Sequence, residues 1–215
     1  MYSLNEIDAM AKRATRGAGY NWGHAEEAGK ATRWLAEHDF SGPELLAQLL
    51  TLNDSKSYHK TAPCFENGKW QAREGDLCPL LAGSILSDHA MDISGSGIFE
   101  FSDVAYPLFL APYAVVASGG TGNGAVLFWD ELVLHVGPHG VAVSGNREAL
   151  MSPFTAQVTC RIDRTADVVA SLSKCGRVVK DESWRILGKL AQRTFAPATD
   201  ASRLAGAGAG VSEND

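Results

Sequence analysis

The chain has 215 residues, of which 45% are hydrophobic and 20% are charged. These values are typical of one large globular domain, and a chain of this length can bury a sizeable core without disulfides or metal ions. The 19 basic and 25 acidic residues give a net charge of −6. This balance argues against non-specific nucleic-acid binding, which needs a basic surface, and against a basic helix lying on a membrane.

The N-terminus and the cysteines favour a cytoplasmic protein. Met1–Glu6 lacks the cationic start and apolar run of an export signal, and no window approaches the roughly 18 apolar residues of a membrane span. The cysteines are widely spaced and form no C-x-x-C motif. Reduced thiols that pack as small core residues are therefore expected.

Residues 1–52 predict three helices. Two S-x-x-E capping boxes, which begin at Ser3 and Ser41, mark the starts of the first and third helices. The first helix is expected to end near Gly17, and the second to run from residues 21–23 to about residue 37. The spacing of the apolar residues gives each of these helices one buried face.

The middle of the chain changes from helical to strand patterns. Residues 53–78 are polar and without periodicity, which predicts a long loop with at most one short strand, and a further helix is expected over residues 79–90. Residues 98–162 contain apolar runs separated by glycine-rich turns, which is typical of antiparallel strands. The expected strands are residues 108–118, 125–129, 132–136, 141–144 and 154–162.

The end of the chain predicts one helix and a tail. A helix capped by Asp181 should run to about Phe195, and residues 196–215 form a glycine-rich tail. We therefore expect one α+β domain over residues 1–195. Its N-terminal helices should pack on a mainly antiparallel β-sheet, with the C-terminal helix and the tail following.

Familiar cofactor signatures are absent. The glycine-rich run 119–124 lacks G-x-G-x-x-G spacing and leads into a strand, so no helix N-terminus is available for a pyrophosphate. Residues 23–30 resemble a P-loop, but the spacing is one residue too long and the run lies within a predicted helix. We expect no cofactor.

Candidate nucleophiles and metal ligands are equally weak. Cys64 and Cys78 fall in the irregular region, near histidines in sequence, but inert thiols are the simpler interpretation. The pair His135 and His139 has no third ligand in sequence. The cluster at residues 88–92 is better explained as a solvated helix end, so no metal site is expected.

The segment Arg16–Trp34 is the most site-like part of the sequence. It combines a glycine-rich bend, two tryptophans and many titratable side chains. A bend that leads into a helix start exposes backbone N–H groups, which favour an anion. The predicted ligand-binding residues are Arg16, Gly17, Gly19, Trp22, Arg33 and Arg203. Weaker candidates for proton transfer are His24 and Glu27.

An ordinary structural explanation of this segment stays open. Glu26 and Lys30 have the spacing of a favourable i,i+4 ion pair, as in a solvated, self-stabilised helix. Trp22 and Trp34 would then be packing anchors. The tail is similarly ambiguous: it either frays or wraps over the domain and brings Arg203 to the helical end.

Four segments carry a resemblance to a known family. They are the Arg16–Gly19 bend, Trp22-Gly23, the run Ala25–Gly29 and the tail Gly206–Gly210. Together they resemble a mainly proteobacterial family of domains of unknown function, in the same order along nearly the whole chain. The resemblance implies a stand-alone bacterial protein and brings no established activity, ligand or catalytic residue.

Two functions remain open on sequence alone. The first is binding or turnover of a small anionic metabolite at the Arg16–Arg33 segment. The second is a non-catalytic subunit or a homo-oligomer that uses the Ala/Gly-rich face of the second helix as a partner surface. Neither involves nucleic acid or a membrane, and whether the chain is an enzyme is left undecided.

Overall fold

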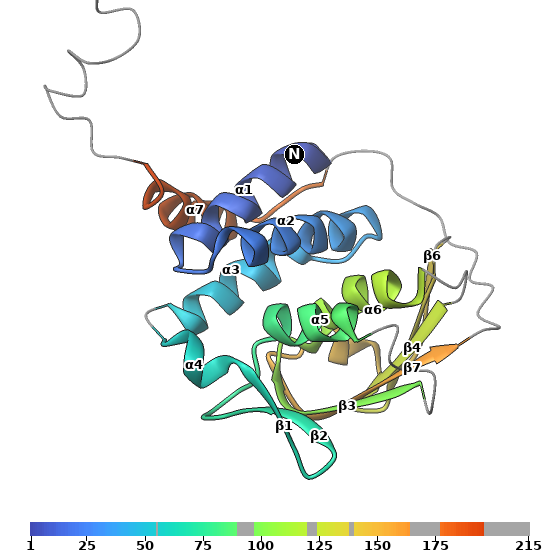
Figure 1. Cartoon of the computed structure of the whole chain (residues 1–215). Helices are drawn as coiled ribbons and strands as arrows, with labels where there is room; N and C mark the ends of the chain where they lie inside the picture. The colour runs from blue at the N-terminus through green and yellow to red at the C-terminus, as the bar shows by residue number, and fades with distance from the viewer. Residues whose placement is uncertain (55, 90–96, 120–123, 138–139, 164–176, 196–215) are drawn as a thin grey trace, which may run out of the picture.

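The computed structural model describes residues 1–54, 56–89, 97–119, 124–137, 140–163 and 177–195 (Figure 1). These residues form the α+β fold that the sequence predicts. The helices are α1 (Leu4–Gly17), α2 (Trp22–Glu37), α3 (Gly42–Asn53), α4 (Tyr58–Thr61), α5 (Pro79–Asp88), α6 (Leu110–Gly119) and α7 (Asp181–Gln192), with 3₁₀ turns at Pro107–Phe109 and Arg147–Met151. The strands are β1 (Pro63–Glu66), β2 (Lys69–Ala72), β3 (Ile98–Ala105), β4 (Gly124–Trp129), β5 (Leu132–Gly137), β6 (Gly140–Gly145) and β7 (Phe154–Asp163).

The molecule is built in three layers (Figure 1). Helices α1, α2, α3 and α7 pack together as one layer, and α5 and α6 lie between this layer and the sheet. The N-terminal helices therefore cover α5 and α6, whereas the sequence predicted that they pack on the sheet. No helix in the described part of the chain is long and apolar enough to cross a membrane.

The sheet has the strand order β1-β2-β3-β7-β4-β5-β6. Its pairs are antiparallel, as predicted, except for β2 and β3, which run parallel and meet at Trp70 and Phe101. Strands β4, β5 and β6 form a simple meander. Strand β7 returns between β3 and β4, so the two halves of the sheet are joined by a strand that comes late in the sequence.

Two predicted elements are wrong. Residues 108–118 were expected to form a strand, but they form the end of a 3₁₀ turn and most of helix α6. This helix is buried on nearly every side, and an apolar run without periodicity does not distinguish a buried helix from a buried strand. Residues 53–78, predicted as a long loop, contain the short helix α4 and the β1–β2 hairpin.

The helix starts follow the sequence only in part. The Ser3 box is present, with Ser3 Oγ accepting from Glu6 N and Glu6 accepting from Ser3 N. The box predicted at Ser41 is wrong, because the Ser41 side chain makes no capping bond. Glu44 instead accepts a hydrogen bond from Lys180 N at 2.9 Å and is nearly buried. The Glu44 carboxylate, which the capping box would use, is instead bound to the start of α7.

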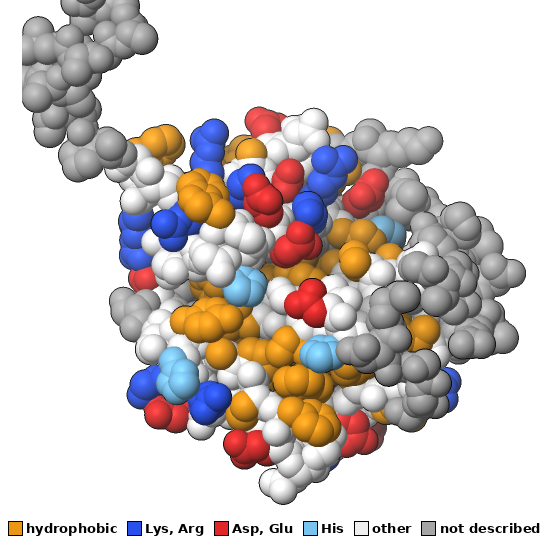
Figure 2. Space-filling model, viewed as in Figure 1, with side chains coloured by type: hydrophobic (Ala, Val, Ile, Leu, Met, Phe, Trp, Pro, Cys, Tyr) orange, Lys and Arg blue, Asp and Glu red, His pale blue; other side chains and the backbone are white. Residues whose placement is uncertain are grey.

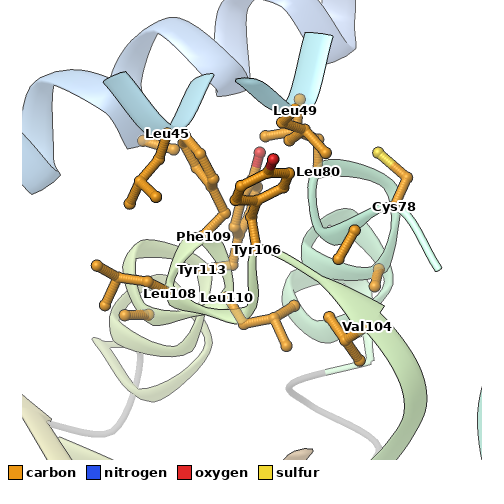
Figure 3. Close-up of a cluster of buried hydrophobic side chains, with 14 of the residues drawn as sticks. Leu45, Leu49, Cys78, Leu80, Val104, Tyr106, Leu108, Phe109, Leu110 and Tyr113 are labelled. Atoms are coloured by element: carbon orange, nitrogen blue, oxygen red, sulfur yellow. The ribbon is translucent and has the colours of Figure 1, made fainter. Parts of the chain in front are cut away.

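The core joins the three layers. Figure 3 shows side chains of α3, among them Leu45 and Leu49, directed toward Tyr106, Phe109 and Tyr113 below them. Contact between α5 and α6 is close, since a Cβ atom at Gly83 would lie 2.3 Å from the Tyr113 ring. Burial of such large side chains is the main favourable term in the folding free energy.

A second glycine fixes how α1 meets α7. A Cβ atom at Gly17 would lie 1.8 Å from the carbonyl oxygen of Leu190, which is backbone and cannot rotate away. Gly17 was predicted to bind ligand, and this contact gives it a structural role in helix packing.

We expect Gly17→Ala to lower the free energy of unfolding by about 1–3 kcal/mol, because α7 must shift to admit the methyl group. Gly188→Ala is the matched control, since a Cβ atom there meets nothing within 4 Å. Alanine is the better helix former by about 1 kcal/mol, so the control should be neutral or stabilising. Urea denaturation of the two variants checks the difference, and equal stability would contradict it.

Candidate functional site

Hydrogen bonds to the backbone fix the conformation of the bend between α1 and α2. Gly19 has φ 103°, a left-handed conformation that favours glycine, and its N–H donates to Arg16 O at 3.1 Å. Asn21 then caps α2 by accepting from His24 N at 2.8 Å. Arg16 closes the bend, because its Nη1 donates to Tyr20 O at 2.9 Å.

Two pockets adjoin this bend. The first, here called the Tyr20 pocket, has a volume of about 210 Å³ and is lined by Ala18, Gly19, Tyr20, Asn53, Lys56, Tyr58 and Thr61. The second, here called the arginine pocket, has a volume of about 340 Å³ and is lined by Arg16, Gly17, Trp22, Arg193 and Thr194. The bend thus supplies residues to both pockets.

The inner wall of the Tyr20 pocket consists of polar side chains that are almost fully buried. Tyr20, Asn53 and Thr61 are 8%, 6% and 5% exposed. Asn53 Nδ2 donates to the Tyr20 hydroxyl at 3.2 Å, and that hydroxyl is 3.3 Å from Cys78 Sγ. Burial raises the pKa of Tyr20, so its hydroxyl keeps its proton at neutral pH.

The outer wall of the Tyr20 pocket has one cation and one aromatic ring. Lys56 is exposed, and no described residue forms an ion pair or hydrogen bond with its ammonium group. Tyr58 is 56% exposed, and its ring centroid is 5.9 Å from that of His24. Figure 2 shows hydrophobic side chains gathered on the face that carries α4, α5 and the β1–β2 hairpin.

His24 contacts the ring of Tyr58 but lines neither pocket. Its Nδ1 is buried without a hydrogen-bond partner. Burial lowers the pKa of His24, and the negative charge of Asp88 opposes that shift. The ring is therefore neutral at pH 7 and, if a proton acceptor were needed nearby, its free nitrogen would be available.

Two of the described cysteines, Cys78 and Cys160, are poor nucleophiles because they are buried. Cys78 is fully buried at the start of α5, and burial raises its pKa even though Tyr20 and the backbone N–H groups of Leu80 and Leu81 act in the other direction. Burial also raises the pKa of Cys160 to about 12. Within the described part of the chain, no cluster of three or more His, Cys, Asp or Glu side chains could hold a metal ion.

The predicted ligand-binding residues are divided between the two pockets. Gly19 lines the Tyr20 pocket, whereas Arg16, Gly17 and Trp22 line the arginine pocket. Trp22 is 55% exposed, and the guanidinium of Arg16 lies 5.4 Å from its ring centroid. Arg33 lines neither pocket, because its Nη1 donates to Asn5 Oδ1 at 2.8 Å. Arg203 lies outside the described residues.

Helix α2 also differs from prediction in its ion pairs. Glu27, a candidate for proton transfer, accepts from Lys30 at 2.7 Å and lines neither pocket. The predicted Glu26–Lys30 pair is wrong: Glu26 binds Lys12 of α1 instead, at 2.6 Å. The Glu26 carboxylate, which the sequence assigned to a pair within α2, therefore joins α2 to α1 instead.

The Ala/Gly face of α2 is an internal helix contact. Ala25, Ala28 and Gly29 are buried, and a Cβ atom at Gly29 would lie 2.5 Å from Oδ1 of Asp8 in α1. Small residues here let α1 and α2 approach closely. This face is covered by the chain itself, so a partner surface would have to lie elsewhere.

Sequence reasoning missed most of the Tyr20 pocket. Asn53, Lys56, Tyr58 and Thr61 come from the segment predicted as a loop, and no motif marks them. The only sequence feature that could have indicated this pocket is the length of the polar, aperiodic segment 53–78. A loop of that length is uncommon in a compact domain unless it packs against the domain or has a function. Arg193 of the arginine pocket lies at the C-terminal end of α7, and no motif in the sequence marks it as a binding residue.

Comparison with known families supports part of the sequence reading. Residues 2–74 match the model of a family described as a protein of unknown function (DUF3726). The predicted resemblance to a domain-of-unknown-function family is therefore confirmed over this segment. Every lining residue of the Tyr20 pocket falls within it, whereas Arg193 and Thr194 of the arginine pocket do not. No curated protein matches the chain at a significant level.

Two solved structures are similar to the chain in part. A malate dehydrogenase from Entamoeba histolytica is 12% identical with a TM-score of 0.45, over 78% of this chain and 50% of that one. A malate dehydrogenase from Pyrococcus horikoshii OT3 is 11% identical with a TM-score of 0.48, over 87% of this chain and 64% of that one. The chain thus spans less than two thirds of each enzyme, and these scores are too low to bear on function.

The negative charge of Asp88 near His24 predicts how the pKa of His24 responds to a substitution at residue 88. We expect Asp88→Asn to lower the pKa of His24 further, because it removes the negative charge that favours the imidazolium. Since the folded-state pKa lies below the unfolded value, the stability contributed by His24 is present at high pH. This stability begins to be lost as the pH falls below the unfolded value near 6.5, and the loss is complete once the pH has fallen through the lower folded-state pKa.

Proton NMR titration of the His24 ring in wild type and Asp88→Asn checks this shift. Glu74→Gln is the control, because the Glu74 carboxylate is bound to Lys60 and has no part in the shift of His24. A pKa of His24 that is unchanged or raised in Asp88→Asn would show that Asp88 does not act on the ring.

Proposed function

We propose that this chain binds a small anionic metabolite in the Tyr20 pocket. The observation that carries the proposal is Lys56: this exposed residue lines the pocket, and its ammonium group has no carboxylate partner among the described residues. A lysine that is free to pair at the mouth of a polar pocket attracts a negatively charged group. The sequence pointed to arginines of the neighbouring segment, and the geometry of the pocket favours Lys56 instead.

The inner wall suits the uncharged end of such a ligand. No described group donates to Asn53 Oδ1, although Asn53 is 6% exposed and its Nδ2 is used by Tyr20. The oxygen is not among the buried atoms that lack a partner, so it reaches solvent and can accept from a ligand hydroxyl or amine. Thr61 Oγ1 makes only a long bond of 3.5 Å, to Tyr58 O, and can also contact a ligand.

The size and charge of the pocket limit the ligand. A cavity of about 210 Å³ lies below the usual 300–1,000 Å³ of drug-sized sites, so a compact molecule is expected. One lysine offers one charge partner, and the chain carries a net charge of −6 that repels polyanions. A single carboxylate with a hydrogen-bonding group at its other end meets these conditions.

We place this activity in the bacterial cytoplasm. The described cysteines Cys64, Cys78 and Cys160 are free thiols, and such thiols persist in a reducing compartment. A bacterial source follows the family resemblance in the sequence. We propose binding alone, because neither His24 nor Glu27 lines the pocket.

The proposal predicts the effect of removing one charge. Wild type, screened against small monocarboxylates, dicarboxylates and phosphate monoesters, should show a rise in melting temperature with monocarboxylates through mass action. Lys56→Gln should lose that rise, since a charge-assisted contact contributes about 1.5–3 kcal/mol, or roughly 10- to 100-fold in affinity. Thermal shift followed by calorimetry on each hit measures both.

Lys60→Gln is the matched control, because Lys60 lies on α4 and is bound to Glu74 outside the pocket. It should respond like wild type. A hit whose affinity is the same in Lys56→Gln, or an anion screen without any hit, would remove the basis of the proposal.

A further inference from the structure

We propose that the arginine pocket is an oxyanion site, and that an oxyanion bound there loosens the wall of the Tyr20 pocket. The inference rests on the proposed function for its biological meaning, since it describes how binding in the Tyr20 pocket is regulated. The supporting observation is that both arginines of this pocket are hydrogen-bonded to the neighbouring wall. Arg16 binds Tyr20, which forms the inner wall of the Tyr20 pocket, and Arg193 binds Asp54, which directly follows the wall residue Asn53.

Arg16 holds Tyr20. Its Nη1 donates to Tyr20 O at 2.9 Å, and the side chain of the same tyrosine reaches into the other pocket. The rest of the guanidinium lies against the ring of Trp22 and makes no other hydrogen bond or ion pair with a described residue. Arg16, which lines the arginine pocket, therefore has donors that no described residue uses.

Arg193 holds the end of α3. Its Nη1 and Nη2 donate to Oδ1 and Oδ2 of Asp54 at 2.6 and 2.9 Å, a bidentate pair. Asp54 directly follows Asn53, whose amide supports the Tyr20 hydroxyl. The pair thus ties the last helix to the residue next to the pocket wall.

The Arg193–Asp54 pair is open to competition. Its side chains are 50% and 30% exposed, and solvent screens ion pairs at that exposure. Phosphate and other tetrahedral oxyanions present the same bidentate acceptor edge to a guanidinium as a carboxylate does. With Arg16 on the same pocket, an oxyanion gains a second cationic donor group that Asp54 does not use.

Competition of this kind couples the two pockets negatively. An oxyanion that binds Arg193 breaks the bidentate tie between α7 and Asp54, and Asn53 is then less firmly placed against Tyr20. Binding in the Tyr20 pocket requires both residues in position, so oxyanion and metabolite oppose each other. By linkage the metabolite must weaken oxyanion binding by the same factor.

Cys78 provides a readout that does not depend on knowing the metabolite. Its Sγ is fully buried beside the Tyr20 hydroxyl, so it can react only when that wall opens. The protein is labelled with N-ethylmaleimide, an uncharged reagent, over a range of inorganic phosphate at constant ionic strength. Peptide mass spectrometry then gives the labelling rate of Cys78, and of Cys160 in β7 as an internal measure of global unfolding.

We expect phosphate to raise the Cys78 rate in a saturable way by about fivefold, a typical coupling factor, without changing the Cys160 rate. Arg193→Gln should label rapidly without phosphate and no longer respond. Arg193→Lys, which keeps the charge but loses the bidentate geometry, serves if the first variant is unstable. Lys189→Gln, on the same helix and in neither lining, should behave like wild type.

Lys56→Gln separates this inference from the proposed function. If phosphate acts at the arginine pocket, its effect on Cys78 persists in Lys56→Gln. If the effect disappears in Lys56→Gln and survives in Arg193→Gln, phosphate binds in the Tyr20 pocket, and the inference is wrong while the proposed function gains support. A Cys78 rate that phosphate leaves unchanged or lowers also overturns the inference.

Discussion

The hydroxyl of Tyr20 joins three parts of the chain that are distant in sequence. It accepts a hydrogen bond from Asn53 at the end of α3 and contacts Cys78 at the start of α5, while its own residue sits on the bend between α1 and α2. A buried polar group that loses its partners costs about 1–3 kcal/mol. That is a large share of the roughly 5–15 kcal/mol by which a domain is stable, so this contact constrains all three segments together.

The same contact explains why a polar pocket exists in an apolar layer. The helices around Tyr20 pack through large and small apolar side chains, with Gly17 and Gly83 removing Cβ atoms where α7 and Tyr113 come closest. Tyr20 and Asn53 break this pattern: Asn53 Nδ2 donates to the Tyr20 hydroxyl, and both residues line the pocket together with Lys56. Polar groups in the wall of a pocket favour a ligand that brings its own hydrogen bonds.

Charge on this part of the molecule is organised by tertiary pairing. Lys12 binds Glu26 across the α1–α2 contact, and Arg193 binds Asp54 across the α7–α3 contact. Lys56 and the remaining donors of Arg16 are left without partners in the described chain, and each residue lines one of the two pockets that adjoin the bend. A net charge of −6 makes such free cations the natural points for anions to bind.

The sequence by itself determined the elements whose signals are local. The spacing of apolar residues was enough to predict α1, α2 and α7 within a few residues, and the Ser3 box marks the start of α1. The cap predicted at Asp181 is wrong, because Lys180 is the N-cap of α7 and no side chain caps this helix. The bend at Gly19 was likewise visible, since φ 103° favours glycine. Tertiary structure decided the rest. Helix α6 is buried on nearly every side, which its sequence does not distinguish from a buried strand. Glu44 forms no capping box on α3, because its carboxylate accepts a hydrogen bond from Lys180 N. The Tyr20 pocket forms because residues 18–20 and 53–61 meet. No local pattern encodes a contact between segments so far apart, so only the folded chain could show which of the candidate residues share a site.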